Sequence, residues 1–145
     1  MNTAPRRRPA PVLLDTCAAL WLANGDPLSA AGLAAIRGAV RQGAGVYVSP
    51  ISAWEISLLA ARGRLGLSMP AREWFDALLE LPGLRLAELT ADILIDSNML
   101  GHDPPRDPAD RILVATARAL GAPVVTRDRQ IVDYAKGGHV EAVVC

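Results

Sequence analysis

Five short runs of apolar residues, separated by longer segments with helical periodicity, constrain the fold of this chain more than any other feature. The runs cover 11–15, 45–49, 84–89, 123–126 and 139–145. Runs this short and continuously apolar are typical of strands buried in a parallel sheet. Helical patterns fill the intervals at 16–23, 29–41, 51–62, 69–83, 90–100, 107–121 and 127–138. The alternation predicts a three-layer α/β domain with a parallel sheet between helices.

Capping residues mark several of the predicted helix boundaries. Ser49 followed by Pro50 supplies an N-cap and a first-turn proline for the helix over 51–62. Thr90 is placed to cap the helix over 90–100. The strongest helix of the chain begins at the capping acid Asp107 and ends at the terminal Gly121. We therefore expect these helices to start and stop close to the capping residues.

Size and composition limit the class of protein. The chain has 145 residues, 51% of them hydrophobic and 21% charged, which fits one globular domain over 11–145 with a loose tail over 1–10. The formal net charge is zero, so a basic footprint covering the whole protein is absent, although local basic clusters remain possible. Cys17 and Cys145 make no disulfide framework, and no secretory signal or membrane-spanning run is present. We expect a cytoplasmic protein.

The predicted helix over 51–62 carries an acid on its apolar face. At about 100° per residue, Glu55 projects near the middle of the face formed by Ile51, Trp54, Leu58 and Leu59. Burying a lone carboxylate costs several kcal/mol unless a partner compensates. A buried ion pair with an arginine would explain Glu55 without any function, and we favour a functional role over it.

The predicted helix over 107–121 repeats this anomaly. Its apolar face consists of Leu113, Val114, Ala117 and Leu120, and Asp110 falls on that face. Favourable interaction with the positive helix end would account for Asp110 as well as a functional role does. For Asp107 we favour the plain helix cap.

Two further acids stand where predicted strands end. Asp15 ends the first apolar run, and Asp128 follows the fourth within "VVTRD". Each alone is explained as a helix cap. However, the carboxyl ends of parallel strands border the crevice in which such folds bind ligands. We therefore expect the two strand-end acids to share a small volume with Glu55 and Asp110.

Four carboxylates in one small volume repel each other. A like-charged pair 4 Å apart costs about 4 kcal/mol at an effective dielectric near 20, so the pKa values rise or a cation neutralises the group. His102 and His139 are isolated in the sequence, which argues against zinc. Oxygen ligands without soft donors suit Mg²⁺ or Mn²⁺. The acids therefore predict a divalent-cation site suited to phosphodiester cleavage.

Four segments of the chain carry a family resemblance. They are "LLDTCAALWL", "ISAWEISLLAARGRLGL", "DPADRILVATARALG" and "VVTRDRQIVDY". In this order and spacing they resemble the PIN-domain ribonucleases, in particular the VapC-type toxins of bacterial type II toxin–antitoxin modules. The likeness runs from Val12 to the C-terminus. It implies a PIN-like three-layer α/β/α fold with a central five-stranded parallel sheet.

The resemblance also implies functional positions. The four catalytic and metal-binding acids of the family match Asp15, Glu55, Asp110 and Asp128. Thr126 matches a small hydroxyl residue beside the last acid, and Asp107 matches a secondary acid. Such toxins often have a histidine two residues before this secondary acid, where the chain has Pro105. This departure affects a substrate contact and removes no metal ligand.

The activity implied by the resemblance is that of an endoribonuclease dependent on Mg²⁺ or Mn²⁺. Water activated by the cation would attack the phosphorus in line and leave a 5′-phosphate. As a toxin, such a protein inhibits translation and growth until a cognate VapB-type antitoxin neutralises it. The resemblance further implies an RNA substrate and a homodimer.

Arginines next to the acids are candidate contacts to RNA phosphates. They are Arg106, Arg111, Arg127 and Arg129. Internal pairing or simple surface solvation explains them as well; for Arg111 the two interpretations are balanced, and for the others the structural one is preferred. The three tryptophans, Trp21, Trp54 and Trp74, are better explained as core or interface residues than as base-stacking platforms.

Two other classes of function remain as alternatives. A catalytically silent PIN-like RNA-binding module would keep the fold, but degenerate members lose acids and all four are present here. A phosphoacceptor receiver-like domain would need an acidic pair after the first strand and a lysine near the last one. The first run ends in a single acid, and Lys136 stands at a helix end flanked by glycines. These features favour the nuclease.

Overall fold

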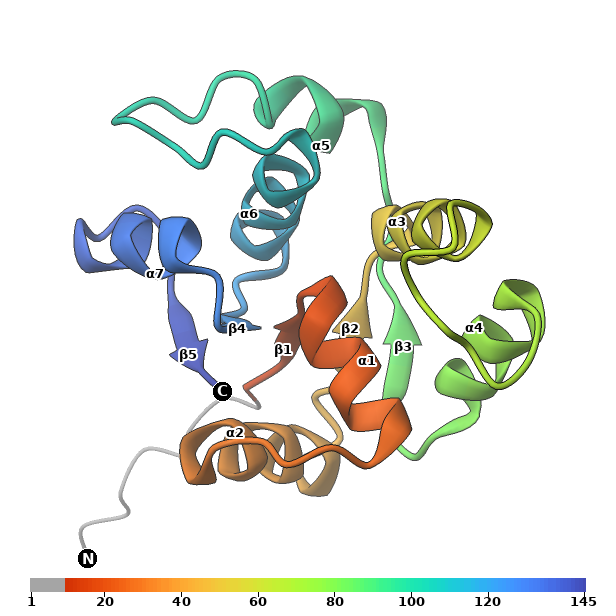
Figure 1. The fold of residues 1–145 in the computed structure, drawn as a ribbon. Helices are drawn as coiled ribbons and strands as arrows, with labels where there is room; N and C mark the ends of the chain where they lie inside the picture. The colour runs from red at the N-terminus through yellow and green to blue at the C-terminus, as the bar shows by residue number, and fades with distance from the viewer. Residues whose placement is uncertain (1–9) are drawn as a thin grey trace, which may run out of the picture.

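A sheet of five short parallel strands forms the middle of the protein (Figure 1). The computed structural model describes residues 10–145. The strands are β1 Val12–Leu14, β2 Val46–Val48, β3 Leu84–Leu86, β4 Val124–Thr126 and β5 Ala142–Val144. Their order is β3-β2-β1-β4-β5 and every pairing is parallel. The five predicted strands are therefore confirmed, and β1 lies at the centre of the sheet.

Seven helices connect the strands within the described residues. They are α1 Thr16–Asn24, α2 Ala30–Arg41, α3 Pro50–Ala61, α4 Ala71–Glu80, α5 Ala91–Asp96, α6 Pro108–Leu120 and α7 Arg129–Lys136. The predicted caps Ser49, Thr90 and Asp107 all accept hydrogen bonds from the first turns of their helices. Sequence patterns located every helix of the described residues, and at these three helix starts the caps satisfy backbone groups that would otherwise be unpaired.

The predicted helix over 90–100 is wrong at its end, because α5 stops at Asp96. The N–H groups of Asn98 and Met99 bond to carbonyls three residues back, at 3.0 and 2.9 Å, where an α-helix would bond four residues back. The chain leaves the helix in this tight turn and enters the loop before α6.

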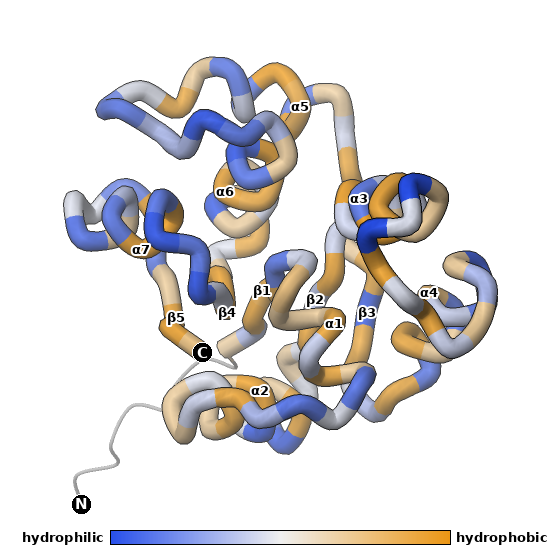
Figure 2. Tube along the Cα trace, in the orientation of Figure 1, coloured by the Kyte–Doolittle hydropathy of each residue, from blue (hydrophilic) through white to orange (hydrophobic). Residues whose placement is uncertain are grey.

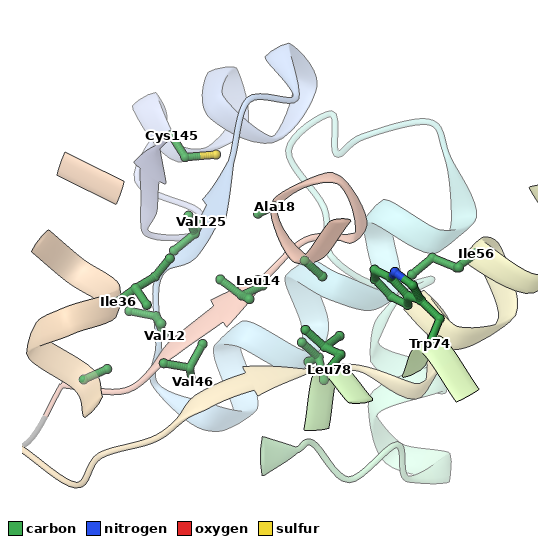
Figure 3. Close-up of a cluster of buried hydrophobic side chains, with 13 residues drawn as sticks. Val12, Leu14, Ala18, Ile36, Val46, Ile56, Trp74, Leu78, Val125 and Cys145 are labelled. Atoms are coloured by element: carbon green, nitrogen blue, oxygen red, sulfur yellow. The ribbon is translucent and has the colours of Figure 1, made fainter. Parts of the chain in front are cut away.

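Alternate residues of each strand face opposite layers, which gives the three-layer arrangement. Val12 and Leu14 of β1 belong to one core cluster with residues of α1, α2, α3 and α4, and Figure 3 shows Leu14 at its centre. Leu13 belongs to a second cluster with residues of α5, α6 and α7. Both clusters contain side chains with 0% exposure. The expected three-layer α/β/α fold is confirmed.

The carboxyl ends of β1 and β4 lead directly into α1 and α7, so both helices begin at one edge of the sheet (Figure 1). Hydrophilic residues gather where β4 passes into α7 and along the segment between α5 and α6 (Figure 2). No helix of the described residues is long and apolar enough to cross a membrane. The predicted N-terminal tail lies outside the described residues except for Ala10, whose N–H donates to Gln42 at 3.1 Å.

Candidate active site

A pocket of about 360 Å³ lies at this edge of the sheet, and five carboxylates from four separate segments line it. The acids are Asp15, Glu55, Asp107, Asp110 and Asp128, and the remaining lining residues are Thr16, Cys17, Trp21 and Arg127. The four acids that the sequence predicted to converge therefore do lie together. Their roles as catalytic residues and metal ligands stay a prediction.

Asp15 is the most buried acid of the pocket, with 5% of its surface exposed. One carboxylate oxygen accepts from the Ala18 N–H at 2.7 Å and the other from the Thr126 hydroxyl at 2.5 Å. Burial raises the pKa of Asp15, the two hydrogen bonds oppose the rise, and the negative charge of Asp128 adds to it. Asp15 is thus both the cap of α1 and a fixed carboxylate in the pocket wall.

Glu55 is half-buried on α3 and is held by the first residue of α1. The Thr16 hydroxyl lies 2.6 Å from Glu55 Oε1, to which it donates, and 2.9 Å from the hydroxyl of the fully buried Ser52. Burial raises the pKa of Glu55, the bond from Thr16 lowers it, and the charges of Asp107 and Asp15 raise it. No buried arginine pairs with Glu55, since the only ion pair among residues 10–145 joins Lys136 to Asp133.

Asp110 shows most clearly that the acids repel each other. Burial raises its pKa to about 7, and the charges of Asp128, Asp107, Glu55 and Asp15 each contribute to the rise. The same surroundings raise the pKa of the Cys17 thiol to about 11, again with burial as the largest cause. The pocket therefore has a strongly negative potential that favours protons or cations.

Asp107 and Asp128 cap helices and also line the pocket. Asp107 Oδ1 accepts from the N–H groups of Ala109 and Asp110 at 2.8 and 3.2 Å, as expected for the cap of α6. Asp128 Oδ1 accepts from the Ile131 N–H at 3.0 Å at the start of α7. The plain cap interpretation is thus correct for both acids, and it does not compete with a place in the pocket.

Arg127 is the cation of the pocket lining, and it is fixed by internal contacts. Its guanidinium carbon lies 4.0 Å from the centroid of the Trp21 ring, and its nitrogens donate to the carbonyls of Cys145 and, at 3.1 Å, Pro27. The structural interpretation of Arg127 is therefore observed, and its position at the pocket leaves contact with a phosphate open as well.

The other arginines differ in their surroundings. Arg111 donates from Nε to the Pro105 carbonyl at 2.6 Å, so it fastens the loop before α6, and it does not line the carboxylate pocket. Arg106 and Arg129 are exposed. Of the four arginines next to the acids, Arg127 alone contributes to the lining of this pocket.

The predicted orientation of α3 is wrong in part. Ser52 and Ile56 are its buried residues, whereas Trp54, which was expected on the inner face, is 58% exposed. The small Ser52 lets α3 approach α1 closely enough for the contact with Thr16. Of the other tryptophans, Trp74 is in the core, as expected, and Trp21 is half-buried beneath Arg127.

Sequence reasoning missed Thr16, Ser52 and Trp21 as members of the site. A signal for Thr16 was available, since it follows Asp15 directly at the strand-to-helix turn and begins α1. Nothing in the sequence pattern indicated Ser52, because small polar residues carry little periodicity information. Trp21 was assigned to the core or an interface, and the structure also places it against the pocket cation.

The pocket residues fit a divalent cation by their chemistry. Five carboxylates offer hard oxygen donors, and their repulsion contributes to the raised pKa values of Asp15, Glu55 and Asp110. No three His, Cys, Asp or Glu side chains among residues 10–145 form a ready-made cluster that could hold a metal ion. The fit is therefore one of donor type and charge, and direct coordination by three acids would require the side chains to approach each other more closely.

Comparison with known families supports the resemblance noted in the sequence. A family model described as "PIN domain" matches residues 12–137. Ribonuclease VapC22 of Mycobacterium tuberculosis (strain ATCC 25618 / H37Rv) is 35% identical over 121 residues, which cover 83% of this chain and 88% of the relative. All five acids of the pocket lie inside the matched range.

Solved structures share the fold at lower sequence identity. VapBC2 from Rickettsia felis, crystallised with a DNA fragment from its promoter, aligns with a TM-score of 0.61 at 13% identity, covering 91% of this chain and 96% of the other. FitAcB from Neisseria gonorrhoeae aligns with a TM-score of 0.53 at 22% identity, covering 92% and 96%. At these identities the likeness concerns the fold alone.

Proposed function

Because this chain belongs to the PIN-domain family, as a VapC-type member, we propose that it is an endoribonuclease toxin that hydrolyses RNA with the help of Mg²⁺ or Mn²⁺. The observation that carries the proposal is the convergence of five carboxylates on one pocket of about 360 Å³. Acids that repel each other in a half-buried pocket are costly for folding, and a cationic cofactor offsets that cost.

Each acid has a proposed role. Asp15, Glu55 and Asp110 would hold the cation directly or through water, and Asp128 would complete the set or help to bind a second ion. When bound, the cation would supply positive charge that stabilises the phosphate in the transition state. It would also lower the pKa of water, so that water loses a proton more readily as it attacks phosphorus. The repulsion among the acids means that binding would expel the proton that Asp110, with its pKa of about 7, partly retains at neutral pH.

Neighbouring hydroxyls orient two of these acids. Thr126 donates to Asp15, whose other carboxylate oxygen accepts from the Ala18 N–H, and Thr16 donates to one oxygen of Glu55. Residues that orient metal ligands in this way tune both affinity and geometry. The guanidinium of Arg127, at the same pocket, would bind a phosphate of the RNA strand.

The wider context belongs to the same proposal. We propose that the protein acts in the cytoplasm as a homodimer, that RNA cleavage inhibits translation and growth, and that a VapB-type antitoxin neutralises it. Two comparisons support this proposal: the relative VapC22 is named a ribonuclease, and VapBC2 shares the fold. A catalytically silent RNA-binding role is the less favoured alternative, since a binding module has no use for clustered, mutually repelling acids.

The decisive experiment incubates the purified protein with cellular RNA and Mg²⁺ or Mn²⁺ and maps the new 5′ ends. Attack by water predicts ends that carry a 5′-phosphate and ligate directly to an adaptor. Ends with a 5′-hydroxyl would indicate attack by the RNA 2′-hydroxyl and would overturn the proposed chemistry. Intact RNA at all cation concentrations would favour the silent binding module.

A further inference from the structure

A second pocket has a volume of about 390 Å³, and some of its lining residues neighbour those of the carboxylate pocket in the sequence. It is formed by the loop before α6, by one face of α7 and by the turn after α7. Arg106 lines this pocket and the next residue, Asp107, lines the carboxylate pocket. Likewise, Asp128 lines the carboxylate pocket, and Gln130, two residues later, lines the second pocket. The linings of the two pockets are therefore close neighbours along the chain at two places, which is the basis for treating both as parts of one RNA-binding surface.

Three aromatic rings form a contiguous array in the second pocket, with two of them stacked and the third tilted. The rings of His102 and His139 lie 4.4 Å apart between centroids at an interplanar angle of 8°, and the Tyr134 ring lies 4.9 Å from His139 at 34°. The two histidines, isolated in the sequence, are thus neighbours in space. The face of the His102 ring turned away from His139 contacts no other ring among the described residues, so a further flat partner could extend the stack there.

Hydrogen bonds hold this array in place. The Tyr134 hydroxyl donates to the Gly101 carbonyl at 2.8 Å and accepts from Arg118 at 3.0 Å. Arg118 also donates from Nε to the His139 carbonyl at 2.8 Å. The array is therefore fixed before any ligand arrives, which lowers the entropic cost of binding.

The loop that presents His102 is held in an unusual conformation. Both His102 and Asp103 have φ of +58°, in the left-handed region that residues other than glycine seldom adopt. The Arg106 N–H donates to Gln130 Oε1 at 2.8 Å and ties the far end of the loop to α7. The protein thus keeps an imidazole at the pocket against a conformational cost, as is common at binding sites.

The polar groups of the pocket complement a nucleotide. The Asp133 carboxylate accepts hydrogen bonds, the Gln130 side-chain nitrogen donates them, and Arg106 supplies positive charge beside the carboxylate pocket. Aromatic rings, including those of histidine, commonly stack on unpaired RNA bases. We propose that this pocket binds one unpaired RNA base next to the cleaved phosphate and prefers a base with an exocyclic amino group, which Asp133 accepts from. The inference rests on the proposed function in taking RNA as the substrate.

The chain offers a direct reporter of this pocket, because its two histidines both line it. The imidazole signals in the proton NMR spectrum therefore report binding without further assignment. Metal-free protein in EDTA is titrated with AMP, CMP, GMP and UMP and with a short single-stranded oligoribonucleotide. We expect both imidazole signals to shift, and we expect UMP to bind with the lowest affinity of the four mononucleotides. This measurement does not depend on RNA cleavage.

Substitutions separate stacking from edge contacts. His102→Asn removes the ring but suits the left-handed backbone, so it should fold and bind the oligoribonucleotide about fivefold or more weakly, as expected for the loss of one base stack. Asp133→Asn should bind it but lose the discrimination against UMP. The control Asp92→Asn changes another exposed acid, on α5, which lines neither this pocket nor the carboxylate pocket, and should change neither property.

The possible outcomes distinguish failure of the base-pocket inference from failure of the proposed nuclease function. RNA cleavage by the native protein, together with unmoved imidazole signals and unchanged affinity of folded His102→Asn, would overturn the inference and leave the function intact. Shifted signals without cleavage would support the pocket and count against the nuclease. Imidazole signals that respond to a peptide and to no nucleotide would also overturn the inference, because the occupant would then be a protein partner.

Discussion

The hydroxyl of Thr126 donates a 2.5 Å hydrogen bond to the carboxylate of Asp15, although 111 positions separate the two residues in the chain. The same hydroxyl accepts from the Asp128 N–H at 2.9 Å. One fully buried side chain thus links the end of β1 to the start of α7 and sets the distance between two acids of the pocket. This link leads to the first prediction.

Thr126→Val, which keeps the shape and removes the hydroxyl, should lower RNA cleavage by about 10- to 100-fold, the usual effect of losing a residue that orients a metal ligand. Stability should fall by about 1–3 kcal/mol because a buried carboxylate loses a donor. The control Thr116→Val removes an equally buried hydroxyl that donates to the Ile112 carbonyl within α6. Denaturant unfolding and initial cleavage rates measure both variants, and equal activity losses in the two would contradict the prediction.

Glu55→Gln and Asp15→Asn should each lower the cleavage rate by at least about a hundredfold. Loss of a proposed metal ligand should have a larger effect than loss of a residue that orients one. Asparagine at position 15 can still cap α1, so circular dichroism should show an intact fold. Both variants should relieve any growth arrest caused by expression. Full activity in both would remove the basis for a carboxylate-held cation.

Chelation should silence the protein reversibly. Cleavage should stop in EDTA and return on addition of Mn²⁺ or Mg²⁺, because a pocket lined by five carboxylates needs added positive charge to hold a phosphate. Ca²⁺ in the same concentrations tests whether charge alone is enough. Persistent cleavage in EDTA, at unchanged rate across repeated purifications, would point to a mechanism without a metal.

The pH dependence of stability should reveal the raised pKa of Asp110. Its pKa is about 7 in the folded protein and 3.8 when unfolded, so between pH 4 and 7 the folded state binds more protons. Stability without metal therefore falls as pH rises through this window, and the loss from Asp110 is complete above it. Asp110→Asn should flatten the curve of melting temperature against pH. Its melting temperature should exceed that of the native protein by the largest margin near pH 8. Asp76→Asn, on the exposed side of α4, should leave the slope unchanged.

Much of the fold was predictable because local signals agree with the tertiary structure. Ser49, Thr90 and Asp107 satisfy helix starts in any context, and short apolar runs such as Val12–Leu14 have no stable place except inside the sheet. The convergence of Asp15 and Asp128 followed from parallel strands alone, because their carboxyl ends share one edge.

Other features depend on contacts that no periodicity encodes. The rotation of α3 is set by Ser52 meeting Thr16, so the bulky Trp54 faces outward despite its hydropathy. The stack of His102 on His139 requires two consecutive left-handed residues in a loop, a conformation fixed by its hydrogen bonds to α7. Such side-chain placements emerge only when distant elements pack.

The strand order has a consequence for biosynthesis. β1 is made first and lies at the centre of the sheet, yet its neighbour β4 leaves the ribosome only after residue 124 has been added. A nascent chain that ends before Thr126 carries four of the five pocket acids but lacks Asp128 and the hydroxyl that positions Asp15. Under the proposed function, the growing polypeptide would therefore spare the RNAs of the translating ribosome until β4 and the start of α7 have been synthesised.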